Sequence, residues 1–145
     1  ADAMIVRLPQ RLLPLLVGLI AACALAVACA GQEAAPDNVY IADENDNGQS
    51  VTMAPGDALQ ITLPENRSTG YVWSVVTNDE AVLRPTDEPA YEIEGEPLPG
   101  AGGKVTFTFT AAAAGAVTLR LVNARPQETA VQPVATFELN VQVSE

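Results

Sequence analysis

Carboxylate and amide side chains come nearest to a chemical site in this sequence. The segment Asp43-Glu44-Asn45-Asp46-Asn47-Gly48 places oxygen donors at alternate positions and ends on glycine, which is how a calcium-binding loop begins. The twelfth position of that loop requires a bidentate glutamate, and this sequence has Ala54 there. Asn47-Gly48 also suits the type I′ turn of a β-hairpin. We therefore expect a hairpin here, and calcium binding is the weaker alternative.

A second set of carboxylates alternates along the chain at Glu92, Glu94 and Glu96. An extended segment would project these three side chains to one side, and paired carboxylates can perform acid–base catalysis. Nothing in the neighbouring sequence predicts the apolar pocket that would keep one of them protonated. We therefore expect a solvated, self-repelling loop or edge strand.

Histidine is absent from all 145 residues, and its absence excludes several enzyme mechanisms. Neither a Ser-His-Asp triad nor a Cys-His pair can form within the chain. The common zinc sites built on histidine are excluded as well. The balance of 7 Lys+Arg against 18 Asp+Glu gives a formal net charge of −11, which opposes binding to a phosphate backbone. We expect a protein that is not an enzyme, with no metal, no cofactor and no nucleic-acid partner.

The first thirty residues differ in composition from the rest of the chain. Arg7 and Arg11 precede an apolar run from Leu12 to Ala30, which contains both cysteines, Cys23 and Cys29. A basic start, an apolar stretch and a small-residue ending are typical of a secretory signal peptide. The segment resembles the leader of a bacterial lipoprotein, in which a cysteine after small residues is lipidated and becomes the new N-terminus.

Two cysteines compete for the lipid. Cys23 has the better aliphatic residue three positions before it, whereas Cys29 lies at the end of the apolar run and is preferred. An uncleaved anchor is the alternative, because about 19 apolar residues just suffice to span a bilayer. We expect a signal peptide of lipoprotein type at residues 1–29, a flexible tether at 30–37 and a folded domain at 38–145. Either form of the leader places that domain on the extracytoplasmic side of a membrane, as an exported, membrane-anchored protein.

The folded domain alternates short β-rich runs with turn signals, at the spacing of an all-β sandwich. Val105, Phe107 and Phe109 alternate with threonines, and the same alternation recurs near residues 117–121 and 137–143. Strands with one apolar face each need a second layer to cover them, which predicts two packed antiparallel sheets. We expect Ala111–Ala114 to make a tight crossing between strands rather than a helical turn. The expected strands lie near residues 39–42, 49–53, 58–63, 71–76, 104–110, 116–122 and 134–143.

Three short segments between the expected strands carry the stronger functional signal. They are Asn66–Gly70, which is followed by Tyr71-Val72-Trp73, then Gly100–Gly103, and then Arg125–Gln127. Taken singly, each has an ordinary interpretation as a turn, a flexible loop or the end of a strand. Their order and spacing together resemble the chagasin-like family of cysteine peptidase inhibitors. That family's three loops read Asn-Pro-Thr-Thr-Gly with a following aromatic residue and Trp, then Gly-x-Gly-Gly, then Arg-Pro-Trp, and the resemblance covers about residues 48–143.

The resemblance implies an immunoglobulin-like antiparallel β-sandwich with three loops clustered at one end. It implies a reversible inhibitor that occludes the active-site cleft of a papain-like cysteine peptidase, and we expect the inhibitor to be a monomer. Thr69 and Gly70 would lie nearest the catalytic residues of the peptidase, and Trp73 is expected in the core. Asn66 is expected to hydrogen-bond the backbone of its own loop. The residues that the resemblance assigns to peptidase binding are Asn66, Arg67, Ser68, Thr69, Gly70, Gly100, Ala101, Gly102, Gly103, Arg125, Pro126 and Gln127.

Two residues depart from the family pattern. Arg67 stands where the family has proline, and the freed backbone is expected to weaken preorganisation by about 0.4–1 kcal/mol. Gln127 stands where the family has tryptophan, a residue that often contributes about 2 kcal/mol or more to an interface. These departures leave open an alternative function, that of an extracytoplasmic protein-binding module of the same fold without inhibitory activity.

The leader predicts lipid attachment at Cys29. Metabolic labelling with a fatty acid should mark the native protein and the Cys23→Ser variant, whereas Cys29→Ser should lose the label because the acceptor thiol is gone. Label that persists in Cys29→Ser but disappears in Cys23→Ser would assign the lipid to Cys23. A native protein without label would exclude lipidation.

Overall fold

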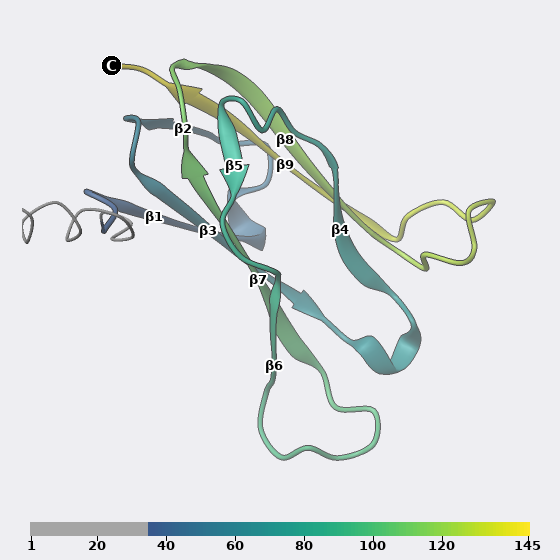
Figure 1. Cartoon of the computed structure of the whole chain (residues 1–145). Coiled ribbons are helices and arrows are strands. Elements are labelled where there is room, and N and C mark those ends of the chain that lie inside the picture. The colour runs from purple at the N-terminus through teal and green to yellow at the C-terminus, as the bar shows by residue number, and fades with distance from the viewer. Residues whose placement is uncertain (1–34) are drawn as a thin grey trace, which may run out of the picture. The chain divides into compact units, whose positions relative to one another are not determined.

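The computed structural model describes residues 35–145, so the predictions for the leader and for most of the tether lie outside the described residues. Two stacked β-sheets make up this part of the chain (Figure 1). One sheet has the strand order β1-β3-β7-β5, with β6 also paired to β7, and the other has the order β2-β9-β8-β4. Within residues 35–145, no helix has the length and apolar character needed to cross a bilayer.

The strands largely follow the expected ranges. They are β1 (Val39–Asp43), β2 (Ser50–Met53), β3 (Ala58–Glu65), β4 (Val72–Thr77), β5 (Leu83–Pro85), β6 (Ala90–Ile93), β7 (Gly103–Ala111), β8 (Gly115–Ala124) and β9 (Ala135–Val143). Two short 3-10 helices, η1 (Glu44–Asp46) and η2 (Arg67–Thr69), lie between strands. The sequence predicts an all-β sandwich, and the structure confirms it.

The core forms where the apolar faces of the two sheets meet. Val105, Phe107 and Phe109 of β7 are buried, while the intervening threonines are more exposed, so the predicted alternation is confirmed. Leu119 on β8 and Phe137 on β9 meet them from the other sheet. Each buried leucine or phenylalanine contributes about 1.5–3 kcal/mol through its removal from water, and this burial holds the two layers together.

β5 and β6 are two strands that the sequence prediction missed. Both pair only with β7, and neither shows a regular alternation of buried and exposed residues. β5 is three residues long and ends on Pro85, and β6 contains the exposed Glu92. Edge strands bury little, so hydrophobic periodicity, the main signal in sequence, is weak in them.

The segment after β1 is not the predicted hairpin. β1 pairs with β3 and β2 pairs with β9, in different sheets, and both of these pairings are parallel rather than antiparallel. Asn47 has φ −56° and ψ 126° and Gly48 has φ 82°, which is a type II turn and not type I′. The turn therefore reverses the chain while passing it from one sheet to the other.

The polar side chains of this segment serve the turn itself. Asp43 caps η1 by accepting a hydrogen bond from the Asn45 amide at 2.8 Å, and Asp46 accepts one from the Asp43 amide at 2.8 Å. Asn47 donates to the Thr136 carbonyl at 3.1 Å and accepts from the Glu138 amide at 2.8 Å, which ties the turn to β9. Capping and turn formation therefore account for these residues without a bound ion.

The predicted tight crossing at Ala111–Ala114 is confirmed. β7 ends at Ala111 and β8 begins at Gly115, and the three residues between them carry the chain from one sheet to the other without a helical turn. β7 and β8 therefore face each other across the core, and the start of β7 lies at the same end of the sandwich as the end of β8.

Candidate functional site

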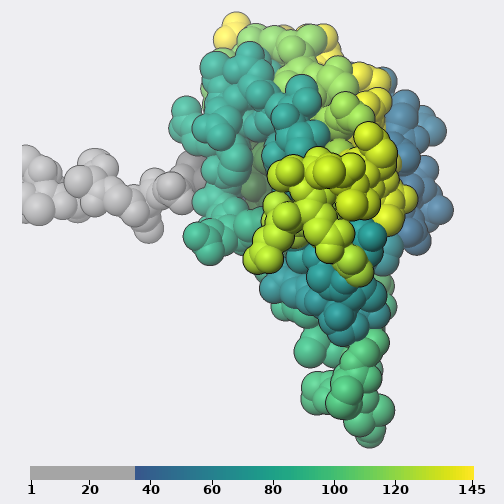
Figure 2. All heavy atoms as spheres, turned by 90° about the vertical axis from the view of Figure 1, so that its right-hand side faces the viewer, coloured from purple at the N-terminus to yellow at the C-terminus, as the bar shows by residue number. Residues whose placement is uncertain are grey.

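Strand register brings the three loop segments to one end of the sandwich. Glu65, the last residue of β3, pairs with Gly103, the first of β7. Val72, the first residue of β4, pairs with Ala124, the last of β8. The first loop (residues 66–71) joins β3 to β4, the second loop (94–102) ends where β7 begins, and the third loop (125–134) starts where β8 ends. Figure 2 shows the three loops in a row, with the first between the other two.

The first loop is built around a single turn of 3-10 helix. Asn66 caps this helix, its side-chain oxygen accepting from the Ser68 amide at 3.1 Å and from the Ser68 hydroxyl at 2.6 Å, as expected for a side chain that ties its own loop. Thr69 donates its hydroxyl to the Asn66 carbonyl at 2.7 Å. Gly70 ends the helix in the left-handed region, with φ 80° and ψ −4°, which favours glycine over any residue with a Cβ. The loop is therefore closed by its own hydrogen bonds.

Two side chains connect the first loop to its neighbours. The Asn66 side-chain amide donates to the Gly100 carbonyl of the second loop at 3.2 Å. Arg125 of the third loop donates from Nε to the Thr69 carbonyl at 3.2 Å, and its guanidinium lies 4.6 Å from the centre of the Tyr71 ring. Asn66 and Arg125 thus join the three loops, which are far apart in sequence, into one hydrogen-bonded unit.

A buried carboxylate lies at the base of the first loop. The Glu65 side chain is only 1% exposed, and it accepts from Arg67 Nε at 2.7 Å and from the Trp73 amide at 2.7 Å. The Arg67 guanidinium lies 4.0 Å from the centre of the Tyr91 ring on β6. Trp73, expected in the core, is half-buried and packs against it, while its indole donates to the Pro64 carbonyl at 2.8 Å.

Sequence reasoning missed Glu65 and Tyr91. A glutamate at the end of a strand carries no sequence signal of burial, because charged residues are almost always exposed unless they are paired. The expectation for Arg67 considered only its freer backbone, whereas the structure shows its side chain held by a carboxylate and a ring.

The second loop is folded by two consecutive turns. The Leu98 amide donates to the Glu96 carbonyl at 2.8 Å, and the Ala101 amide donates to the Leu98 carbonyl at 2.9 Å. Gly100 has φ 84°, as the third residue of the second turn requires. These turns present Leu98 to solvent with 63% of its surface exposed, a feature that the sequence analysis did not single out.

The acidic stretch that leads into the second loop is partly neutralised. Glu94 lies 2.7 Å from Lys104 Nζ and raises the pKa of Lys104 above its ordinary value, mainly through this hydrogen bond. Glu92 lies on β6, an edge strand, and the sequence predicts either an edge strand or a solvated loop here. The expected repulsion among these carboxylates is thus relieved at Glu94.

The glycines of the second signature divide into two kinds. Gly100 and Gly102 have open space where a Cβ would be, so their backbone is accessible to a partner. Gly103 is buried at the start of β7, and a Cβ there would collide with the Glu92 carbonyl oxygen and approach the Tyr91 hydroxyl to 2.9 Å. Packing against β6 is therefore sufficient to explain glycine at position 103.

The third loop borders a hollow beside the first loop. This hollow has a volume of about 360 Å³, and its lining residues are Gly70, Arg125, Pro126, Gln127 and Glu128. Arg125 Nη1 pairs with Glu128 at 3.1 Å, and two successive turns fold the loop through the Glu128 and Val131 amides. Gln127, at the position of the expected tryptophan, is exposed.

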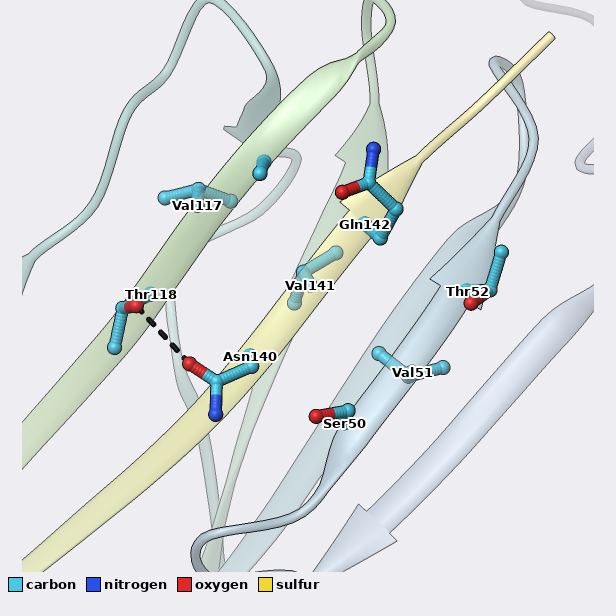
Figure 3. Close-up of a pocket in the computed structure, with 9 residues that line it drawn as sticks. Ser50, Val51, Thr52, Val117, Thr118, Asn140, Val141 and Gln142 are labelled. Carbon is cyan, nitrogen blue, oxygen red and sulfur yellow. Dashed lines mark hydrogen bonds between the residues drawn. The ribbon is translucent and has the colours of Figure 1, made fainter.

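A second hollow lies away from the loops, on the outer face of the β2-β9-β8-β4 sheet. Ser50, Thr52, Thr118, Asn140 and Gln142 line it from β2, β8 and β9, and Thr118 donates to Asn140 at 3.1 Å (Figure 3). Hydroxyl and amide groups alone cannot perform acid–base chemistry at neutral pH. The loop end, with its accessible glycines and ordered arginines, is the better candidate site.

The architecture and the site together define a class of protein. A β-sandwich that holds three hydrogen-bonded loops at one end resembles the binding modules of immunoglobulin type. Across residues 35–145, no group of three or more His, Cys, Asp or Glu side chains is arranged to hold a metal. The class that the fold defines is an immunoglobulin-like β-sandwich with three adjoining loops at one end.

Comparison with known proteins identifies the family. The family model described as Chagasin family peptidase inhibitor I42 matches residues 52–141. Chagasin from Trypanosoma cruzi is 31% identical over 86 residues, which cover 55% of this chain and 76% of that protein. The chain therefore belongs to the chagasin family of peptidase inhibitors, and it is an inhibitor rather than an enzyme.

Solved structures support the fold. The crystal structure of the cysteine protease inhibitor EhICP2 from Entamoeba histolytica superposes with a TM-score of 0.67 and 20% identity, covering 74% of this chain and 96% of that one. The structure of PbICP-C in complex with falcipain-2 gives a TM-score of 0.52 and 16% identity, covering 79% and 95%. At these identities the likeness establishes the sandwich architecture.

Gly103→Ala is predicted to destabilise the domain, because the added methyl group collides with backbone on β6. We expect a loss of about 1–3 kcal/mol in the free energy of unfolding, measured by urea denaturation. Gly102→Ala is the matched control, because nothing lies within 4 Å of its added Cβ, and it should leave stability nearly unchanged. Equal stability of the two variants would contradict the packing role of Gly103.

Proposed function

We propose that this domain reversibly inhibits papain-like cysteine peptidases by filling the active-site cleft with the first loop and gripping its rims with the second and third. The observation that carries this proposal is the hydrogen-bonded unit of three loops, joined through Asn66 to Gly100 and through Arg125 to Thr69. Membership of a family of peptidase inhibitors supports it. EhICP2, which has the same fold, is itself described as a cysteine protease inhibitor.

Rigidity is what such an inhibitor needs from its loops. Binding costs free energy for every flexible segment that must be ordered, and loops that are already fixed avoid this cost. The first loop is closed by a cap, a left-handed glycine and a hydroxyl bond. Its exposed turn would fill a cleft with backbone that is held too firmly to reach the geometry of cleavage.

The proposed contact surface follows from exposure. It comprises residues 66–70, 100–102 and 125–127, and Gly103 supports it from within the sheet. Leu98 joins this surface, because an exposed leucine fixed by two turns adds apolar contact at little entropic cost.

A membrane-attached location is part of the proposal. The leader at residues 1–29, with Cys29 at its end, supports lipid anchoring on the extracytoplasmic side, where the domain would meet peptidases from outside the cell. A monomer suits this role, because the loop end must be free to enter a cleft.

Gln127 favours a second candidate function. Without the tryptophan of the family pattern, the third loop offers less apolar surface, so the same loops would suit another protein partner. Titration of purified residues 30–145 against several papain-like peptidases, with a serine peptidase as control, separates the two functions. Stoichiometric loss of cysteine peptidase activity supports the inhibitor. Stable binding to a protein without loss of activity supports the binding module.

Gly70→Val is predicted to weaken inhibition by roughly tenfold or more, because a β-branched residue is strained at positive φ and blocks close approach to the cleft. Gly56→Val is the matched control, since Gly56 also has positive φ, 95°, but precedes β3 at the opposite end of the sandwich. Inhibition constants for a papain-like peptidase measure the effect. Equal inhibition constants for the two folded variants would contradict a mechanism centred on the first loop.

Gln127→Trp is predicted to tighten inhibition about tenfold or more, which corresponds to at least 1.4 kcal/mol. An aromatic residue beside the hollow of the third loop adds a large, rigid contact surface, and the gain should appear as slower dissociation. Surface-based binding kinetics with papain measure it. Gln142→Trp, on the outer face of β9, is the control and should leave the dissociation rate unchanged. An unchanged rate for Gln127→Trp would mean that the third loop does not touch the peptidase.

A further inference from the structure

Arg67 forms a cluster with Glu65 and Tyr91 beneath the first loop. Arg67 Nε lies 2.7 Å from a carboxylate oxygen of Glu65, and the guanidinium lies 4.0 Å from the centre of the Tyr91 ring. The Glu65 side chain is 1% exposed, whereas that of Arg67 is 49% exposed. A carboxylate this deeply buried needs its partners, because an unpaired buried charge is costly.

The Glu65 carboxylate holds both ends of the first loop. One oxygen accepts from Arg67, at the start of η2, and the other accepts from the amide of Trp73, just after the loop. Loss of the Arg67 side chain would leave the buried carboxylate with the Trp73 amide as its only donor among the described contacts. The two ends of the loop would then no longer share one anchor.

Tyr91 supplies a fixed surface for the guanidinium. It pairs with Val105 in the β6–β7 ladder, and its ring packs against Gly103, where an added Cβ would lie 2.9 Å from the Tyr91 hydroxyl. The planar guanidinium can donate to a carboxylate while stacking on this ring, which a lysine ammonium cannot do in the same way. The cluster therefore ties the first loop to the strand that leads into the second.

We propose that the Arg67 side chain is the positioning element of the first loop, through its contacts with Glu65 and Tyr91. A proline at this position tests the side chain apart from the backbone. Asn66 has φ −118° and ψ 95°, an extended conformation outside the α region that a following proline disfavours, and Arg67 is the first residue of a 3-10 helix, where proline is tolerated. Arg67→Pro therefore removes the side-chain contacts while restricting the backbone φ at this position.

Amide hydrogen exchange in the full-length protein tests this proposal without a peptidase. In Arg67→Ala and in Arg67→Pro, the Gly70 and Trp73 amides should exchange roughly tenfold faster or more, since both lie in the segment held by Glu65. The amide of Leu119, in the core strand β8, should be unchanged. Arg120→Ala removes an exposed Arg–Glu pair on the sheet and should leave all three amides unchanged.

Coupling to Glu65 distinguishes positioning from a general loss of stability. In a Glu65→Gln background, the further change Arg67→Ala should alter exchange at Gly70 by about twofold or less, because the carboxylate charge that pairs with Arg67 is already gone. Fully additive effects, equal acceleration of the Leu119 amide, or an Arg67→Pro variant that protects Gly70 as well as the parent does would overturn the proposal.

Inhibition provides a second readout, which rests on the proposed function. Where the parent inhibits a papain-like peptidase, Arg67→Ala and Arg67→Pro should both raise the dissociation rate roughly tenfold or more, in step with Gly70 exchange. Faster dissociation of Arg67→Ala alone, with Arg67→Pro like the parent, would assign the effect to the backbone and overturn the proposal. Failure of the parent to inhibit any such peptidase would contradict the proposed function, while the exchange result decides the role of Arg67.

Discussion

The register of the strand pairs is the constraint on which the rest of the structure depends. Glu65 opposite Gly103 and Val72 opposite Ala124 bring the ends of four strands to one place, and each loop begins or ends there. A slip by one residue would turn Phe107 and its neighbours on β7 toward solvent, so burial of the core fixes the register strongly. The hydrophobic core thus determines where the loops stand, although it lies wholly between the sheets.

Polar side chains then fix the conformations of the loops that the core places at one end of the sandwich. The hydrogen bonds of Asn66 and Arg125 cross from one loop to another, and those of Glu65 join the loop to the sandwich. Each such bond contributes only about 0.5–1.5 kcal/mol, which is small beside the core. Their importance is geometric, because they act on segments that have few buried apolar contacts of their own.

The sequence alone predicts the parts of the fold in which one physical signal dominates. Alternation along β7, β8 and β9 reports burial directly, and the cap at Asn66 follows from the chemistry of its short amide. The hairpin prediction at Asn47-Gly48 was wrong because turn residues reveal a reversal of the chain but not the sheet that receives it. Glu65 was missed because its burial depends on Arg67 and Trp73 together, and such a dependence is a property of the folded arrangement.

The two arginines of the loop end use similar contacts in different surroundings. Each guanidinium lies over a tyrosine ring and pairs with a glutamate, but Glu65 is 1% exposed and Glu128 is 44% exposed. Water and salt screen the exposed pair of Arg125, whereas the pair of Arg67 is shielded on its carboxylate side. The ion pair that anchors the first loop is therefore buried on its carboxylate side. The ion pair of the third loop is exposed, so water can compete for both of its charged groups. This division suits the proposed function, in which a stiff central loop would enter the cleft beside a more adaptable loop that would meet its rim.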